Sequence, residues 1–249
     1  MTDFSRNELI WGNENQKLLK EKYVIIFGLG GVGGFVLESL ARAGVSNFTV
    51  VDFDTVSESN VNRQLIALHS TIGQKKTELF KQRVLDINPN ANINCISDFY
   101  NESLCDEIFA KTPDFVVDAI DTMRSKIDLL VYCKENNIPV VTSMGAGNRF
   151  DPTKLYITDI KDIENKKCTF TKNVLYQLKK RGIEEGITAI CSSESPNVLE
   201  KVSSIEQIET SKGEKIEFKK FTPGSTPFVP AVAGYYMAYY VVGKLINKF

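Results

Sequence analysis

The stretch Tyr23-Val-Ile-Ile-Phe-Gly-Leu-Gly-Gly-Val-Gly33 decides the fold of this chain. Its first half is an apolar, β-branched run, which is typical of a strand buried in a parallel sheet. Glycines follow in the GxGxxG register, where such a strand turns into a helix. Glycine suits this turn because a phosphate can then approach bare backbone N–H groups at the positive end of the helix. We therefore predict a nucleotide-binding α/β fold, with the loop glycines Gly28, Gly30, Gly31 and Gly33 beside the phosphates.

The next expected strand, Phe48 to Asp52, ends in an acid that can accept hydrogen bonds from ribose hydroxyls. Up to this residue the pattern fits NAD, FAD and ATP equally well. The donors that follow favour ATP. Arg63 offers a planar charged fork and Lys76 a compact charge, whereas a dehydrogenase needs little more than backbone amides around a pyrophosphate. Each cation alone is more typical of a solvated surface; together they predict a triphosphate site.

A third apolar segment, Phe115 to Asp121, predicts another buried strand that ends in Asp118 and Asp121. A carboxylate at the C-terminal end of this strand can hold Mg²⁺ against the phosphates of ATP. A helix cap is the alternative role for Asp121. Because the carboxyl ends of parallel strands meet at one edge of the sheet, the acids and cations are expected to converge there.

These motifs resemble the ubiquitin-activating-type adenylating enzymes, a family that includes the bacterial activators for molybdopterin and thiamine biosynthesis. The resemblance implies that Asp52 binds ribose, that Arg63 and Lys76 bind phosphates with Asn60, and that Asp121 assists Mg²⁺. It implies a nucleotide site made of Gly28, Gly30, Gly31, Gly33, Asp52, Asp54, Asn60, Arg63, Gln64, Lys76 and Asp121. Phe4-Ser-Arg6 matches the motif whose arginine reaches the neighbouring subunit's ATP site, which implies a homodimer with Arg6 catalytic in trans.

Residues 138–152, with Asn62 and Ala67-Leu-His-Ser70, are similar to the branch of this family that dehydrates threonylcarbamoyladenosine in tRNA. This resemblance implies that ATP adenylates the threonyl carboxylate, and that the group then cyclises with release of AMP. The chemistry is reasonable, because a carboxylate becomes a good electrophile only with a better leaving group. Ring closure within one nucleoside also has a large effective-molarity advantage.

The five cysteines, Cys95, Cys105, Cys133, Cys168 and Cys191, form no CxxC pair. We therefore expect no structural zinc, which argues against the sulfur-carrier branches of the family. Cys95 and Cys133 lie in apolar patterns and are expected in the core. Cys168 and Cys191 lie where related activators carry a catalytic cysteine, so both stay candidates. The single histidine, His69, is expected to cap or pack, with a substrate contact as the alternative.

The 249 residues, 43% of them hydrophobic, predict a single domain. We expect a Rossmann-like, doubly wound and mainly parallel sheet over 1–160, a basic helix and variable loops over 161–222, and a closing C-terminal helix over 223–249. Strands Val202–Glu209 and Lys215–Phe221 are expected to pair as an antiparallel extension. Phe228–Ile246 is strongly apolar but contains Pro230 and Lys244, so a buried helix starting after Pro230 is preferred to a membrane span.

Basic side chains gather on one expected helix, although the net charge of −1 provides no global attraction to nucleic acid. Val174, Leu175 and Leu178 give this helix an apolar face, so its basic residues should project outward. Phosphate contacts with tRNA are the functional interpretation, and a solvated helix face is the alternative. The residues are Lys166, Lys167, Lys172, Lys179, Lys180 and Arg181.

The sequence therefore favours an ATP- and Mg²⁺-dependent enzyme acting on tRNA, expected in the cytoplasm because its cysteines are unpaired and no signal peptide is evident. Peripheral membrane association and a sulfur-transfer protein as partner stay open. Three rival functions also stay open: an activator of a small sulfur-carrier or ubiquitin-like protein, an NAD(P)-dependent oxidoreductase, and a non-catalytic nucleotide-binding dimer.

Overall fold

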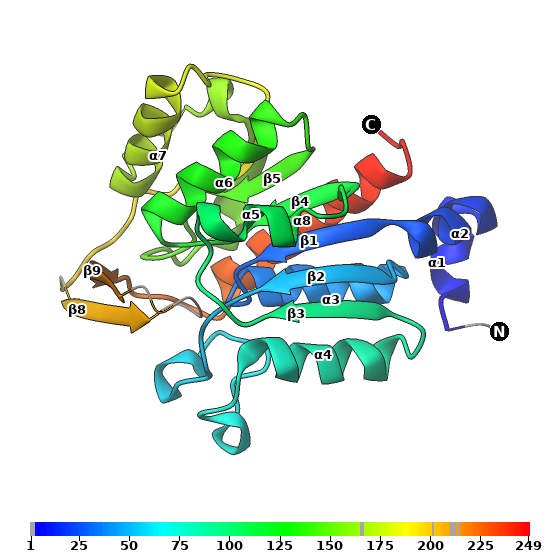
Figure 1. Cartoon of the computed structure of the whole chain (residues 1–249). Helices are drawn as coiled ribbons and strands as arrows, with labels where there is room; N and C mark the ends of the chain where they lie inside the picture. Colours follow the sequence, from blue (N-terminus) through cyan, green and yellow to red (C-terminus); the bar gives the residue numbers. More distant parts are fainter. Residues whose placement is uncertain (1–2, 165–166, 201, 210–212, 214) are drawn as a thin grey trace.

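A computed structural model describes residues 3–164, 167–200, 202–209, 213 and 215–249. Within them, a central seven-stranded sheet has the order β3-β2-β1-β4-β5-β7-β6 (Figure 1). All neighbouring strands are parallel except the antiparallel pair of β6 and β7. The strands are β1 (Tyr23–Phe27), β2 (Asn47–Val51), β3 (Asn92–Ile96), β4 (Phe115–Asp118), β5 (Val140–Ser143), β6 (Leu155–Asp159) and β7 (Thr188–Ser192). The predicted Rossmann-like fold is confirmed.

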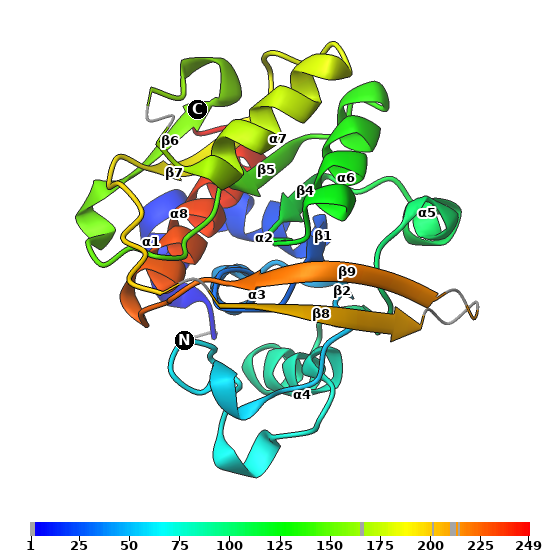
Figure 2. The same ribbon diagram turned by 90° about the vertical axis from the view of Figure 1, so that its left-hand side faces the viewer.

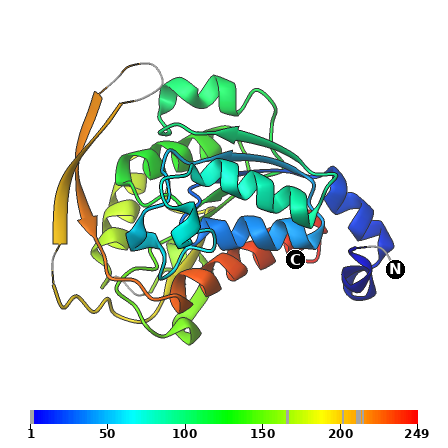
Figure 3. The same cartoon turned by 90° about the horizontal axis from the view of Figure 1, so that it is seen from below.

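Helices cover both faces of this sheet. One face carries α3 (Gly33–Ala43), α4 (Lys76–Ile87) and α8 (Phe228–Leu245), which Figure 3 shows side by side. The other carries α5 (Cys105–Ile108), α6 (Met123–Glu135) and α7 (Thr169–Lys180). Two short helices, α1 (Ser5–Trp11) and α2 (Asn13–Glu21), lie at the end of the sheet where β1 begins. The 3₁₀ turns are η1 (Glu58–Asn60), η2 (His69–Thr71), η3 (Glu102–Leu104), η4 (Pro152–Lys154) and η5 (Ile160–Asp162).

The pleat of β1 explains why its apolar run has no polar face. Val24 and Ile26 belong to the hydrophobic core shared with α3, α4 and α8, whereas Ile25 and Phe27 belong to the core shared with α5, α6 and α7. Successive side chains of a strand point to opposite faces, so a strand covered on both sides must be apolar throughout.

The glycine loop is packed too tightly for side chains. Gly28 has a φ of +84°, and a Cβ built on it would lie 2.7 Å from the carbonyl oxygen of Ala119. A Cβ on Gly33 would overlap the carbonyl oxygen of Gly28. These two glycines therefore let the loop after β1 fit against the loop after β4, at the edge of the sheet where a nucleotide is expected.

Two boundaries differ from the sequence prediction. The strand expected to reach Asp121 ends at Asp118, so Asp121 lies in the loop before α6. The closing helix begins at Phe228 rather than after Pro230, which lies in its first turn. Proline is tolerated there because the first N–H groups of a helix have no intrahelical acceptor.

The antiparallel extension is confirmed as a hairpin of β8 (Val202–Glu209) and β9 (Lys215–Thr222). Figure 2 shows this hairpin lying across the carboxyl ends of the central strands. Its expected turn, 211–214, lies outside the described residues except for Gly213. No described helix, α8 included, is both long and apolar enough to cross a bilayer. The division of the chain at residues 160 and 222 stays a prediction, and β7 of the central sheet falls between them.

Candidate nucleotide-binding site

A cavity opens at the carboxyl ends of β1, β2 and β4, beside the glycine loop. Segments far apart in the chain form its wall. They include Ala146 and Gly147 after β5, Thr222 at the end of β9, and Pro223 and Ser225 after it. The predicted site residues that line it are Gly28, Gly30, Gly31, Asp52, Asp54, Asn60, Arg63, Gln64, Lys76 and Asp121. The structure therefore brings these predicted residues together, and their binding of a nucleotide stays a prediction. Gly33 is buried at the start of α3 and is not among the lining residues.

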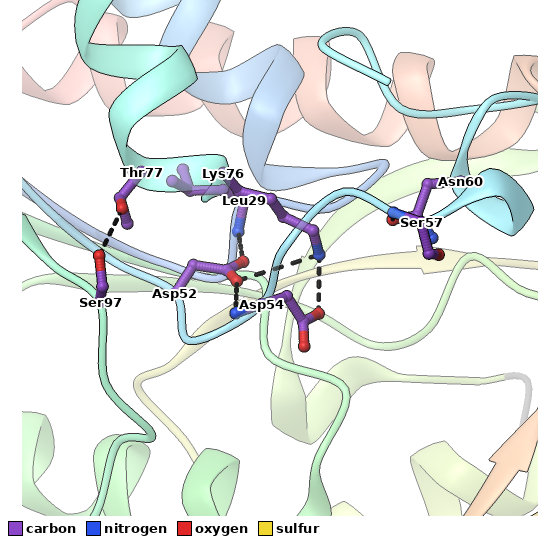
Figure 4. Close-up of polar contacts among 8 residues, drawn as sticks. All are labelled: Leu29, Asp52, Asp54, Ser57, Asn60, Lys76, Thr77 and Ser97. Atoms are coloured by element: carbon purple, nitrogen blue, oxygen red, sulfur yellow. Dashed lines mark hydrogen bonds and ion pairs between the residues drawn. The ribbon is translucent and has the colours of Figure 1, made fainter. Parts of the chain in front are cut away.

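Asp52 joins the end of β2 to the glycine loop. Its Oδ2 accepts a hydrogen bond of 2.5 Å from the backbone N–H of Leu29, and its Oδ1 accepts one of 2.8 Å from Asp54 N (Figure 4). Burial raises the pKa of Asp52, against the opposing effect of the Lys76 charge. A carboxylate has about four acceptor positions, so Asp52 keeps capacity for ribose hydroxyls after these two bonds.

Lys76 is held between two carboxylates at the start of α4. Its Nζ lies 2.7 Å from Asp54 Oδ2 and 3.9 Å from Asp52 Oδ1 (Figure 4). The lysine side chain is 4% exposed and that of Asp54 is 37% exposed. A buried charge needs a partner, and Asp54 is the partner that a phosphate can replace, because it alone reaches solvent.

Two further donors, Asn60 and Arg63, line the same cavity as Lys76. The Oδ1 of Asn60 accepts from Ser57 N at 3.1 Å, so the NH₂ end of this amide is the end available to a ligand. Arg63 NH1 donates to the carbonyl oxygen of Ser59 at 2.6 Å and to Asn62 Oδ1 at 2.8 Å. Burial lowers the pKa of Arg63, and the nearby Asp121 carboxylate opposes this effect. The site thus gathers an arginine, a lysine and an amide donor.

Gln64 has a buried oxygen with no hydrogen-bond partner among the described residues. Gln64 lines the cavity, and a buried acceptor without a partner calls for a donor or a metal ion. With the carboxylate of Asp121, it provides oxygen atoms of the kind Mg²⁺ prefers. Within the described part of the chain, no cluster of three or more His, Cys, Asp or Glu could hold a metal alone.

A buried network that was not predicted from the sequence joins Asp118, Lys126 and Thr142. Lys126 Nζ donates to Asp118 Oδ2 at 2.5 Å and to Thr142 Oγ1 at 3.0 Å, and Thr142 Oγ1 donates to Asp118 Oδ2 at 2.6 Å. The other oxygen of Asp118 accepts from Ile120 N at 3.1 Å, in the loop that carries Asp121. One signal was available: Lys126 stands at the head of an apolar i, i+4, i+7 stripe in α6, where a charge requires a buried partner.

Other predicted residues lie away from the cavity. Arg6 is exposed on α1, at the opposite end of the sheet (Figure 1). The basic residues of α7 point outward as predicted. Two of them make local contacts: Lys179 Nζ lies 2.8 Å from Glu184 Oε2, and Lys180 Nζ lies 4.4 Å from the ring centre of Tyr176. The exposed basic residues are Lys167, Lys172, Lys179, Lys180 and Arg181, while Lys166 lies outside the described residues.

The cysteines are unpaired thiols, and neither Cys168 nor Cys191 lines the cavity. At Cys168, burial favours a higher pKa, but hydrogen bonds from Thr171 and Arg149 outweigh it and lower the pKa. Burial raises the pKa of Cys191 to about 12. Cys133 is buried as expected, whereas Cys95 is only half-buried.

The only histidine, His69, is exposed at the start of η2. It is not among the residues that line the cavity. Its expected capping or packing role stays a prediction.

A doubly wound sheet with a glycine loop, an acid after β2 and an arginine and a lysine at the same edge defines a class of nucleotide-binding α/β proteins. The chain belongs to one family within it: the ThiF family model matches residues 4–248. This confirms the family resemblance drawn from the glycine loop and the donors that follow it.

Proteins similar to this chain carry consistent names. The tRNA threonylcarbamoyladenosine dehydratase of Bacillus subtilis (strain 168) is 42% identical over 247 residues, which cover 98% of this chain and 94% of that protein. A crystal structure of Escherichia coli tRNA N6-threonylcarbamoyladenosine dehydratase, TcdA, in complex with ATP has a TM-score of 0.83 at 27% identity, covering 99% of this chain and 94% of that one. The same protein in complex with AMP has a TM-score of 0.84 at 27% identity, covering 99% and 95%.

Proposed function

We propose that this chain uses ATP to dehydrate threonylcarbamoyladenosine in tRNA to its cyclic form through an adenylated carboxylate. The main support for this proposal is that Asp52, Arg63 and Lys76 line one cavity. The chain also matches a dehydratase over almost its whole length. The relatives in complex with ATP and with AMP correspond to the first substrate and the last product of such a reaction.

The reaction balances without a covalent enzyme intermediate. The threonyl carboxylate attacks the α-phosphorus of ATP, and pyrophosphate leaves. A nitrogen of the same nucleoside then attacks the activated carbonyl carbon and loses its proton, while AMP leaves with the carboxylate oxygen. The net change in the nucleoside is the loss of one water. The enzyme has to position the groups and stabilise developing charge, which is the work of the cations in the cavity.

The site residues take the roles that their positions support. The N–H groups of the glycine loop and the carboxylate of Asp52 hold the nucleotide. Arg63 and Lys76, with the amide of Asn60, bind the phosphates, and Asp54 releases Lys76 when they arrive. Asp121 and Gln64 Oε1 would hold Mg²⁺, which supplies charge neutralisation to the phosphates when bound.

We further propose that the chain works as a homodimer in which Arg6 completes the partner's site. Arg6 lies too far from its own cavity to serve it, at the opposite end of the sheet. On the same short helix, Leu9 is 81% exposed and Ile10 is 72% exposed. On α8, Tyr239 is 62% exposed. Exposed apolar groups of this kind mark contact surfaces, and a second copy of the chain is the occupant consistent with the role of Arg6.

The exposed basic residues of α7 are proposed to contact tRNA phosphates, which would make binding weaken steeply with added salt. The chain is expected to act in the cytoplasm, since its thiols are unpaired and its substrate is tRNA. A sulfur-transfer protein stays a candidate partner, to be sought by co-purification.

The decisive experiment incubates tRNA that carries threonylcarbamoyladenosine with the purified chain, ATP and Mg²⁺. Mass spectrometry of the nucleosides should show the loss of one water from the modified adenosine, with one AMP released per nucleoside converted. An unchanged nucleoside, together with ATP–pyrophosphate exchange that depends on an added carrier protein, would refute the proposal in favour of carrier activation.

A further inference from the structure

Asn62 stands between the arginine of the cavity and a distant segment of the chain. Its Oδ1 accepts a hydrogen bond of 2.8 Å from Arg63 NH1. Its Nδ2 donates one of 2.9 Å to the carbonyl oxygen of Ser225. A single amide thus joins a cation of the phosphate site to residues 222–226, which we name the wall segment and which lead from β9 to α8.

Two hydrogen bonds from NH1 restrict how Arg63 can point, and the bond to Asn62 Oδ1 is the first of them. The Ser59 carbonyl oxygen takes a second hydrogen bond from NH1, at 2.6 Å. Two acceptors on one nitrogen fix the plane of the guanidinium, and they leave its other nitrogens as donors for a ligand. Because Arg63 lines the cavity, the anchored arginine is held ready to bind an anion there.

Asn148 also holds the wall segment by two hydrogen bonds. Gly224 N donates to Asn148 Oδ1 at 2.7 Å, and Asn148 N donates to the carbonyl oxygen of Gly224 at 2.7 Å. Asn148 has a φ of +58°, a conformation that asparagine tolerates better than most residues. Thr222, Pro223 and Ser225 line the cavity. Asn62 and Asn148 therefore both hold this segment by hydrogen bonds where it lines the cavity.

We propose that Asn62 is a positioning residue that aims Arg63 at the phosphates and couples this arginine to the wall segment. The proposal rests on the proposed ATP chemistry of the site. An amide is suited to this place because it accepts from Arg63 and donates to Ser225 at the same time. Aspartate would lack the donor, and leucine, of similar size, would lack both groups. Nucleotide binding at Arg63 would then also order the wall segment.

The test is a double-mutant cycle of Asn62→Leu, Arg63→Ala and the double variant, with kcat and KM measured for ATP. Asn62→Leu should lower kcat about tenfold, because small misplacements of a catalytic group are costly. It should change the KM for ATP less than about threefold, since the other donors remain. In the Arg63→Ala background the same substitution should have no further effect. Equal losses in both backgrounds would overturn the proposal, because they would show that Asn62 does not act through Arg63.

The matched control is Asn136→Ala, which removes another exposed amide that donates to a backbone carbonyl, Tyr132 O at 2.9 Å. It lies at the end of α6 and should leave kcat and KM unchanged. A tenfold loss in this control as well would show that any such substitution damages the fold, and would overturn the assignment.

A second readout does not need turnover and so separates this proposal from the proposed function. ATP should slow hydrogen exchange at Gly224 and its neighbours in the unchanged chain, and should do so far less in Asn62→Leu. Equal slowing in both would overturn the coupling. If the unchanged chain does not convert tRNA, the proposed function fails, and the exchange experiment still decides whether Asn62 couples Arg63 to the wall segment.

Discussion

Replacing Lys126 with methionine should destabilise the whole chain, because it leaves a buried carboxylate without its cation. Lys126 and Asp118 are both 0% exposed, and Nζ lies 2.5 Å from Oδ2. Removing one partner of such a pair typically costs about 3–5 kcal/mol. Asp118 would keep its hydrogen bonds from Thr142 and from Ile120 N, so we expect the lower end, about 3 kcal/mol.

Urea unfolding, followed by circular dichroism, measures this loss. With a slope of about 3 kcal/mol per molar urea, the midpoint should fall by about 1 M. The double variant Lys126→Met, Asp118→Asn should recover part of the loss, at least about 1 kcal/mol, because no uncompensated charge is then buried. A midpoint unchanged in the single variant, or lowered further in the double variant, would refute the reasoning that the pair is a buried charge requiring compensation.

Lys76→Met should lower kcat by about 10²-fold or more, because it removes a preorganised charge from the phosphate site. The control Lys75→Met, at an exposed neighbour, should have little effect. Equal losses of kcat in the two variants would reject the role of Lys76 in phosphate binding. Mixing inactive Arg6→Ala and Lys76→Ala chains should restore about a quarter of full activity, since half of the dimers formed are mixed and each has one intact site; no recovery despite subunit exchange would reject action in trans. Glu38→Gln should destabilise the chain by about 1 kcal/mol at neutral pH, as judged from urea midpoints measured across pH.

The pH dependence of the Glu38 effect has a definite sign. Burial favours a higher pKa for Glu38, but hydrogen bonds and charges from Arg83 and Arg42 outweigh it and lower the pKa in the folded chain. A carboxylate with a lowered pKa contributes stability above the pKa of the unfolded chain and loses it as the pH falls through the folded value. The difference between Glu38→Gln and the unchanged chain should therefore shrink toward zero in acid. A difference that stays constant down to low pH would contradict this explanation.

The sequence predicted those parts of the site that lie close together along the chain. The glycine loop, Asp52 and the donors up to Lys76 fall within one stretch, and each has a local pattern with a physical reason. The wall segment and the Asp118–Lys126–Thr142 network depend on contacts between residues far apart in sequence. No local periodicity predicts that Ser225 meets Asn62, since the hydrogen bond joins a side chain to a backbone carbonyl, which every residue has.

The boundary errors have a similar origin. The apolar run through Ile120 suggested a strand as far as Asp121, but the pairing with β1 ends at Phe27 and Asp118. Ala119 N makes the last hydrogen bond, to the carbonyl oxygen of Phe27, and Ala119 then packs against Gly28. Proline at position 230 suggested a later start for the closing helix, although the first turn of a helix accepts this residue. In both places the tertiary contact, and not the local preference, sets the boundary.

The ion pair between Lys76 and Asp54 makes nucleotide binding an exchange of one anion for another. The free energy gained when Lys76 pairs with the phosphates is reduced by the free energy lost when its pair with Asp54 breaks. The affinity for ATP is therefore lower than it would be for an unpaired lysine. After the reaction AMP carries less negative charge than ATP did, and Asp54 competes for the lysine more successfully. The same ion pair that prepares the site for ATP thereby favours departure of the product, and so promotes turnover.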